Sequence, residues 1–293
     1  MSSGNFGTQI VLRAAGRRNR PALVLPDAGG MVWTFGDIID RSARYAWALR
    51  SLGVEPGDRV AAQVDKSPEA LCLYLGCLRM GGVYLPLNAA YTVHELEYFV
   101  EDSCPALVVC TTEAAEEIEK LCRRANIAAC ETLDAGGSGS LRDIADVVHD
   151  VAVLDEPRGA GDLAALLYTS GTTGRSKGAM ITHGNLSSNA AALLDAWMFR
   201  PEDVLLHALP IFHIHGLFVA ANVSLLAGSS MVFMQKFDAN RIADLMPAAT
   251  VMMGVPTFYT RLLDHQSLNR GLCTDMRIFV SGSTPLLPET HRT

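Results

Sequence analysis

Short apolar segments alternate with helix-like segments along most of this chain, and this alternation limits the folds that the chain can adopt. The stretches between the apolar segments have helical spacing, and several begin at a capping residue such as Ser67 or Thr92 and end at glycine. Repetition of strand and helix predicts an α/β fold with mostly parallel β-sheets flanked by helices. The expected strands lie near 59–64, 106–110, 163–168, 204–208, 230–234, 250–253 and 277–280.

Composition narrows the class of protein further. The chain has 293 residues, of which 49% are hydrophobic, and this excludes disorder or a coiled coil as an overall description. Asp and Glu outnumber Lys and Arg by 31 to 24, and the resulting net charge of −7 disfavours a nucleic-acid partner. Polar residues interrupt the most apolar stretch, 216–234, so we expect no membrane span.

The cysteines and the N-terminus indicate a reducing compartment. The seven cysteines include no C-x-x-C pair, and free cysteines usually behave as small buried hydrophobes. The first residues lack a secretory signal pattern, so we expect a cytoplasmic location. Arginines at 13, 17, 18 and 20 leave a mitochondrial matrix location as the alternative. We expect residues 1–9 to be disordered.

The segment with the clearest chemistry is the loop after the expected strand 163–168. Residues 169–178 hold five hydroxyl side chains, three glycines and Lys177. Glycine allows the backbone to approach a ligand, and successive backbone N–H groups in such a loop form a concavity that binds anions. Lysine adds a mobile charge suited to phosphate, and α/β proteins bind ligands at the carboxyl ends of strands. The loop is therefore predicted to bind phosphate.

Two alternatives to this interpretation are weaker. A Walker A loop requires G-x-x-x-x-G-K-[ST], but Lys177 lies between Ser176 and Gly178, so the spacing fails. A flexible surface linker is the other reading, but linkers are seldom bracketed by apolar runs such as LAALLY and AMI.

The motif YTSGTTGRSKG, at 168–178, closely resembles the phosphate-binding signature of the adenylate-forming acyl-CoA synthetase superfamily, the AMP-binding enzymes. LPIFHIHG, at 209–216, and SGSTPL, at 281–286, resemble two further motifs of that superfamily. The branch most similar to the chain is that of malonyl-CoA and methylmalonyl-CoA synthetases, through stretches such as VYLPLNAAYT and MGVPTFYTRLL. The likeness covers nearly all of 20–293 and corresponds to the first half, or somewhat more, of such a protein.

The resemblance implies a ligase reaction in two steps. A carboxylate attacks the α-phosphate of ATP to give an acyl-adenylate and pyrophosphate, and the thiol of coenzyme A then displaces AMP. The implied catalytic residues are Lys177, Thr172 and His213, and Mg²⁺ is expected to bridge the phosphates. The implied phosphate-binding residues are Thr169, Ser170, Gly171, Thr172, Thr173, Gly174 and Lys177.

The implied acid is a small dicarboxylate such as malonate or methylmalonate, whose second carboxylate needs a cation. Arg261 is the candidate because arginine pairs with carboxylates through two hydrogen bonds, although a surface role is the alternative. His213 and Ser281 complete the expected acyl site. The adenine side is assigned to Gly282, Ser283, Thr284 and Pro285.

In a strand, the H-x-H spacing would place His213 and His215 on one face, where they could bind a metal. No third ligand lies nearby in the sequence, so we assign no residue to a metal.

The resemblance also implies parts that follow Thr293 in the family. These are a glutamate near the metal, an aspartate for the ribose, the hinge, and a small C-terminal domain with a catalytic lysine. We therefore expect residues 10–293 to form an incomplete large ATP-binding domain that does not complete the thioester-forming cycle, with an open strand edge that favours self-association. The alternatives are an adenylating enzyme for a fatty, aromatic or amino acid, and a non-catalytic remnant.

Overall fold

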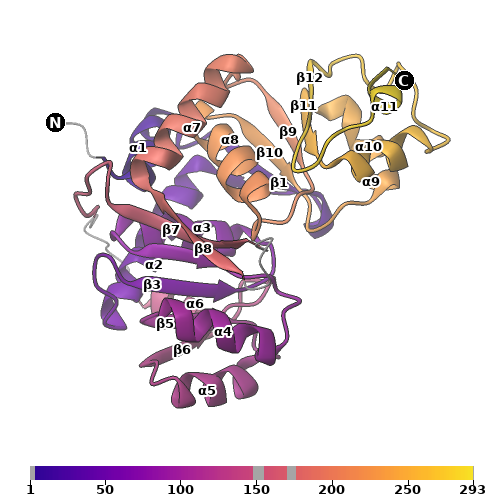
Figure 1. The fold of residues 1–293 in the computed structure, drawn as a ribbon. Coiled ribbons are helices and arrows are strands. Elements are labelled where there is room, and N and C mark those ends of the chain that lie inside the picture. The colour runs from indigo at the N-terminus through magenta and orange to yellow at the C-terminus, as the bar shows by residue number, and fades with distance from the viewer. Residues whose placement is uncertain (1–3, 148–154, 170–175, 293) are drawn as a thin grey trace. The chain divides into compact units, whose positions relative to one another are not determined.

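The computed structural model describes residues 4–147, 155–169 and 176–292, and these residues fold into two compact units (Figure 1). The first unit contains Met1–Leu12 and Asp37–Ser188, and the second contains Arg13–Gly36 and Asn189–Thr293. Each unit has its own β-sheet, and helices α1, α2 and α7 run across the divisions between the units.

The sheet of the first unit has the strand order β6-β5-β3-β4-β7-β8 among the described residues. Its neighbouring strands run parallel except for β7 and β8, which form an antiparallel pair. The strands are β3 (Arg59–Gln63), β4 (Val83–Pro86), β5 (Leu107–Cys110), β6 (Ala129–Thr132), β7 (Leu163–Thr169) and β8 (Lys177–Thr182). The helices that lie wholly or partly in this unit are α1 (Phe6–Ala14), α2 (Phe35–Ser51), α3 (Pro68–Arg79), α4 (Val93–Ser103), α5 (Ala115–Arg124), α6 (Ser140–Asp146) and α7 (His183–Ala196).

The second unit repeats this architecture with a different strand order, β12-β11-β9-β10-β1-β2. Again one pair, β1 with β2, is antiparallel and the other pairs are parallel. Its strands are β1 (Pro21–Leu25), β2 (Met31–Thr34), β9 (Val204–His207), β10 (Ser230–Phe233), β11 (Val251–Gly254) and β12 (Ile278–Ser281). Its helices are a π-helical segment (His215–Ala221), α8 (Asn222–Ala227), α9 (Ala239–Leu245), α10 (Pro256–Leu263) and α11 (Pro288–Arg292). The predicted α/β class with mostly parallel sheets is confirmed.

Capping residues begin two helices of the first unit as the sequence predicts. The Ser67 hydroxyl accepts a hydrogen bond from the Ala70 N–H at 3.1 Å, with Pro68 in the first helical position of α3. Thr92 and Glu95 form a reciprocal capping box at the start of α4, with the Thr92 N–H 2.8 Å from Glu95 Oε2. These bonds satisfy backbone N–H groups that have no partner inside the helix.

The prediction that residues 1–9 are disordered is wrong for the part that the structure describes. Helix α1 begins at Phe6, and both Phe6 and Ile10 are buried. The Asn5 amide donates to the carbonyl of Leu78 at 2.7 Å, and the Phe6 N–H donates to His183 Nδ1 at 3.1 Å. Burial of two apolar side chains, together with these bonds to distant segments, fixes the start of the chain in the first unit.

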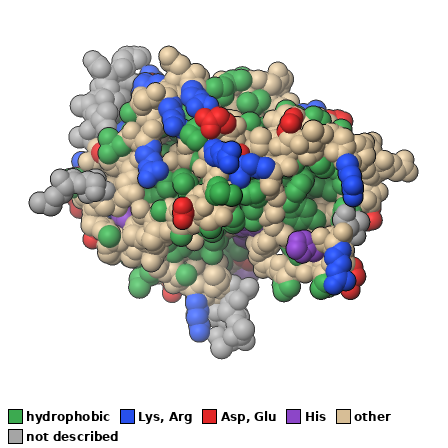
Figure 2. All heavy atoms as spheres, turned by 90° about the horizontal axis from the view of Figure 1, so that it is seen from above, with side chains coloured by type: hydrophobic (Ala, Val, Ile, Leu, Met, Phe, Trp, Pro, Cys, Tyr) green, Lys and Arg blue, Asp and Glu red, His purple; other side chains and the backbone are tan. Residues whose placement is uncertain are grey.

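The surface carries charges of both signs. On the face displayed in Figure 2, Lys and Arg side chains and Asp and Glu side chains are scattered, and hydrophobic side chains show between them. Within the described ranges, no helix is both long and apolar enough to pass through a bilayer.

Candidate functional site

The β7–β8 hairpin places both ends of the predicted phosphate loop side by side. Thr169, the last residue of β7, is the register partner of Lys177, the first residue of β8, and both are exposed. The apolar run 163–168 forms the expected strand, while β8 is a strand that the sequence analysis did not predict. The other predicted phosphate-binding residues, Ser170, Gly171, Thr172, Thr173 and Gly174, lie outside the described residues.

Helix α4 holds the hairpin at the point where the loop ends. The Tyr98 hydroxyl donates a hydrogen bond to the carbonyl of Ser176 at 2.7 Å, one residue before Lys177. The Tyr168 hydroxyl donates to Asp102 Oδ2 at 2.5 Å. The two tyrosine rings meet edge to face with centroids 5.9 Å apart. Burial, followed by the neighbouring Asp102, raises the pKa of Tyr168, so this phenol stays a hydrogen-bond donor. The sequence analysis missed both tyrosine contacts.

In the second unit, the LPIFHIHG motif forms a tight turn into a helix. A side chain at Gly216 would place its Cβ 2.0 Å from the carbonyl oxygen of Pro210, so this position requires glycine. His213 lies in a turn and His215 begins the π-helical segment, so the two histidines do not share the face of a strand. Over the ranges that the structure describes, no cluster of His, Cys, Asp or Glu could hold a metal ion.

The two histidines have different surroundings. His213 is exposed, and its ring lies beside that of Phe212 with centroids 4.3 Å apart. His215 is buried, and its Nδ1 lies 3.3 Å from the hydroxyl of Ser283. Desolvation lowers the pKa of both imidazoles, which favours the neutral form at neutral pH.

The predicted adenine-side turn packs against His215. A side chain at Gly282 would place its Cβ 3.0 Å from His215 Cε1. Ser283 adopts a left-handed backbone with φ of 72°, which is uncommon for residues other than glycine. Thr284 and Pro285 are exposed. The structure therefore brings His215 to the turn, a contact that the sequence analysis did not predict.

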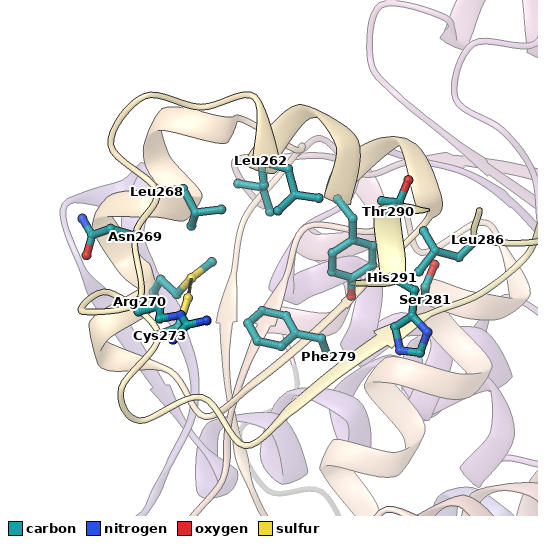
Figure 3. A pocket seen from close by; sticks show the side chains of 13 residues that line it. Leu262, Leu268, Asn269, Arg270, Cys273, Phe279, Ser281, Leu286, Thr290 and His291 are labelled. Atoms are coloured by element: carbon teal, nitrogen blue, oxygen red, sulfur yellow. Dashed lines mark hydrogen bonds between the residues drawn. The ribbon is translucent and has the colours of Figure 1, made fainter. Parts of the chain in front are cut away.

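A cavity of about 690 Å³ lies between α10, β12 and α11 in the second unit (Figure 3). Phe279 from β12 and Leu262 from α10 approach it from opposite sides. Ser281, a predicted acyl-site residue, lines the wall, and its hydroxyl is buried without a hydrogen-bond partner. An unpaired buried hydroxyl is costly, so this group is suited to accept a bond from a ligand or donate one to it.

Arg261, the predicted partner of the second carboxylate, does not line this cavity. It is exposed on α10, and its guanidinium lies over the ring of Phe237, 5.6 Å from the centroid. The structure thus does not bring Arg261 and Ser281 to one cavity wall. It leaves the arginine free of a carboxylate partner among the described ion pairs.

The comparisons with known proteins agree on one family. The sequence model of the family described as AMP-binding enzyme matches residues 11–293. A feruloyl-CoA synthase of Amycolatopsis sp is 32% identical over 290 residues, which cover 98% of this chain and 56% of that protein. The mitochondrial malonate–CoA ligase ACSF3 of Mus musculus is 32% identical over 275 residues, which cover 86% of this chain and 46% of that protein.

Among solved structures, the ATP-bound MatB from Rhodopseudomonas palustris is 50% identical, with a TM-score of 0.95, over 99% of this chain and 57% of that one. The chain spans about half the length of the curated relatives that it matches.

Proposed function

The chain belongs to the AMP-binding enzyme family, and we propose that the protein containing it is an ATP-dependent acid–CoA ligase acting on a small dicarboxylate. The observation that carries the proposal is the pairing of Thr169 with Lys177, which places the two ends of the glycine- and threonine-rich segment side by side. The ATP-bound MatB, half of whose aligned residues are identical, supports ATP as the nucleotide.

The first chemical step joins two anions, and this step defines what the protein must supply. The acid's carboxylate oxygen attacks the α-phosphorus of ATP, the bond to the bridging oxygen breaks, and pyrophosphate leaves with that electron pair. Lys177 would stabilise the charge on the phosphate oxygens, while Thr169 and the loop after it would position the phosphate chain. In the second step the coenzyme A thiol attacks the acyl carbon and AMP leaves.

The neutral state of the histidines fits this chemistry. A protonated imidazole next to the reacting carboxylate would pair with it and weaken its attack. Because desolvation lowers the pKa of His213 and His215, both are expected to stay neutral and to act through hydrogen bonds. We assign His213 to the acyl substrate, and His215 with Ser283 to the adenine-side turn.

Mg²⁺ is expected from the family, but the described residues offer no cluster of ligands that could hold a metal ion. Magnesium is often bound mainly by substrate phosphates and water. We therefore name no residue of this chain as a metal ligand and derive no step through the ion.

Malonate or methylmalonate is the proposed acid, with Arg261 as the cation for the second carboxylate. The similarity to malonate–CoA ligase ACSF3 supports this assignment. An aromatic acid is the second candidate, because the feruloyl-CoA synthase is equally identical and the cavity beside Ser281 is mostly apolar. The proposed location is the cytoplasm, with the mitochondrial matrix as the alternative. Self-association through the edge strand β12 also stays a prediction.

The direct test supplies the full-length protein with ATP, Mg²⁺, coenzyme A and one acid at a time. The acids are malonate, methylmalonate, ferulate and a fatty acid, and the readouts are pyrophosphate release and thioester formation. We expect kcat/KM for malonate or methylmalonate to exceed that for ferulate by about 100-fold or more, as for a site that pairs a polar substrate group. Preference for ferulate would replace the dicarboxylate assignment, and no pyrophosphate release with any acid would contradict ligase activity.

A further inference from the structure

Three cysteines from separate elements gather in the core of the first unit. Cys110 ends β5, Cys122 lies in the last turns of α5, and Cys130 belongs to β6. Cys110 and Cys122 are members of one buried hydrophobic cluster, and Cys130 packs against that cluster while remaining half-buried. All three thiols are free.

The strand register places two of the thiols on one face of the sheet. Cys130 is the register partner of Val108, so the two side chains point to the same face. Cys110 follows Val108 by two positions, and alternate residues of a strand share a face. Cys130 and Cys110 are therefore diagonal neighbours on adjacent strands.

Helix α5 covers that face and brings the third thiol. Ile118 and Leu121 of α5 belong to the same cluster as Val108 and Cys110, and Cys122 lies with them. The Ile127 N–H donates to the Cys122 carbonyl at 2.9 Å, which fixes the turn from α5 back toward β6. The cluster of Cys110, Cys122 and Cys130 is thus set by sheet register and helix packing rather than by flexible segments.

The environment separates one thiol from the other two chemically. Cys110 and Cys122 are buried, whereas Cys130 is half-buried, so Cys130 is the thiol of this cluster that a dissolved oxidant reaches first. The neighbouring thiols of Cys110 and Cys122 also lower the pKa of Cys130, which favours its thiolate, the reactive form of cysteine.

We propose that this cluster is a peroxide-sensitive modification site, in which Cys130 reacts first and then forms a disulfide with Cys110 or Cys122. The chemistry is independent of the ligase activity proposed above. None of the described residues forms a cluster that could hold a metal ion, so the geometry does not favour a site for a soft metal.

The reaction balances with hydrogen peroxide as the oxidant. The Cys130 thiolate attacks one peroxide oxygen, the O–O bond breaks, and hydroxide leaves, which gives a sulfenic acid at Cys130. The neighbouring thiol then attacks the sulfenic sulfur, an S–S bond forms, and the S–O bond breaks. The oxygen leaves as water with the thiol proton, so two thiols are oxidised and one peroxide is reduced.

Mass mapping after a peroxide pulse tests the proposal on the purified protein. Trypsin cuts after Lys120, Arg123 and Arg124, so the three cysteines fall on three different peptides. We expect a linked pair, lighter by two hydrogens, that joins the Cys130 peptide to the peptide of Cys110 or Cys122. The buried Cys72 and Cys77 should stay reduced at the same dose, and dithiothreitol should reverse the link.

Two variants complete the test. Cys104 shares a tryptic peptide with Cys110 but is exposed and outside the cluster, so Cys104→Ser should leave the link unchanged. Cys130→Ser should abolish it. If Cys130→Ser fails to fold, the unmutated protein still decides, because a link through Cys104 or a Cys130 peptide that remains reduced overturns the proposal.

Discussion

Thr169 and Lys177 are register partners at the open end of the antiparallel β7–β8 pair. The Tyr98 hydroxyl donates a hydrogen bond to the carbonyl of Ser176 at 2.7 Å, and this bond fixes the residue that precedes β8. Pairing in the sheet limits how far these two residues can move apart, so Lys177 keeps a set position beside Thr169.

Replacing Lys177 with alanine should lower the rate of ATP-dependent pyrophosphate release in the full-length protein. Loss of one group that stabilises developing charge costs about 100-fold in rate. Lys177→Arg should retain more activity because it keeps the charge. The exposed Lys236 is the matched control, and Lys236→Ala should leave the rate unchanged. Equal rates for Lys177→Ala and the unmutated protein would remove the lysine from the phosphate site.

Tyr98→Phe should raise KM for ATP more than it lowers kcat, since it removes the hydroxyl bond to Ser176 while keeping the ring. A net hydrogen bond is worth about 1 kcal/mol, so the expected rise in KM is about fivefold. Tyr91→Phe is the control, because Tyr91 also packs on Phe99, at 5.2 Å between centroids, but does not reach the hairpin carbonyl. A similar rise in both variants would show that the hydrogen bond from Tyr98 to the Ser176 carbonyl is not the cause.

The sequence predicted the helical and strand segments whose burial pattern is simple. The run LAALLY reads as a buried strand and forms β7, and the capping residues Ser67 and Thr92 mark the starts of α3 and α4 from local chemistry alone. Strand β8 was missed because its six residues are all exposed or half-buried, so it has no apolar signature. Its pairing with β7 makes it a strand.

Local sequence patterns could not predict contacts between residues that are far apart in the chain. His215 and Ser283 are 68 positions apart, and only the fold brings them within 3.3 Å. The H-x-H motif does not lie in a strand, because Gly216 packs on the Pro210 carbonyl where the chain turns into a helix. The start of α1 was missed for the same reason, since its stability depends on burial of Phe6 and on a bond to His183.

Arg261→Ala should impair the use of malonate and spare a monocarboxylic acid. A charged hydrogen-bonded pair is worth about 1.5–3 kcal/mol, so kcat/KM for malonate should fall roughly 10- to 100-fold. Arg261→Lys should recover part of the loss. Arg241, which pairs with Asp27 at 3.6 Å, is the control, and Arg241→Ala should not discriminate between acids. Equal losses with both acids in Arg261→Ala would indicate that the contact with Phe237 is structural.

The first unit should lose stability between about pH 6.5 and pH 4 because of His183. Burial, aided by the charge of Arg158, lowers the pKa of His183 to about 4, while the unfolded chain titrates near 6.5. The folded form therefore holds fewer protons in this window, and the stability present above pH 6.5 falls as the pH drops toward 4. The expected loss is on the order of 2 kcal/mol.

Urea unfolding at pH 7 and pH 5 measures this loss. His183→Gln should be less stable than the unmutated protein at pH 7 but should lose less on acidification. His94, whose side chain is 95% exposed, is the control, and His94→Gln should keep the original pH dependence. An unchanged pH dependence in His183→Gln would mean that another group causes the acid sensitivity.

In the second unit, Asp203 should control acid stability below about pH 4. Burial opposes its ionisation, but hydrogen bonds from Arg277, the Arg200 N–H and Thr250 outweigh this and lower the pKa of Asp203. Stability from these bonds is present above the unfolded pKa, about 3.9, and is lost as the pH falls below it. Asp203→Asn should cost about 3 kcal/mol at pH 7, because it leaves Arg277 without its charge partner, 2.5 Å from Nη2 to Oδ2. The exposed Asp244 supplies the control Asp244→Asn, and equal unfolding midpoints for the two variants would show that the pair with Arg277 contributes nothing to stability.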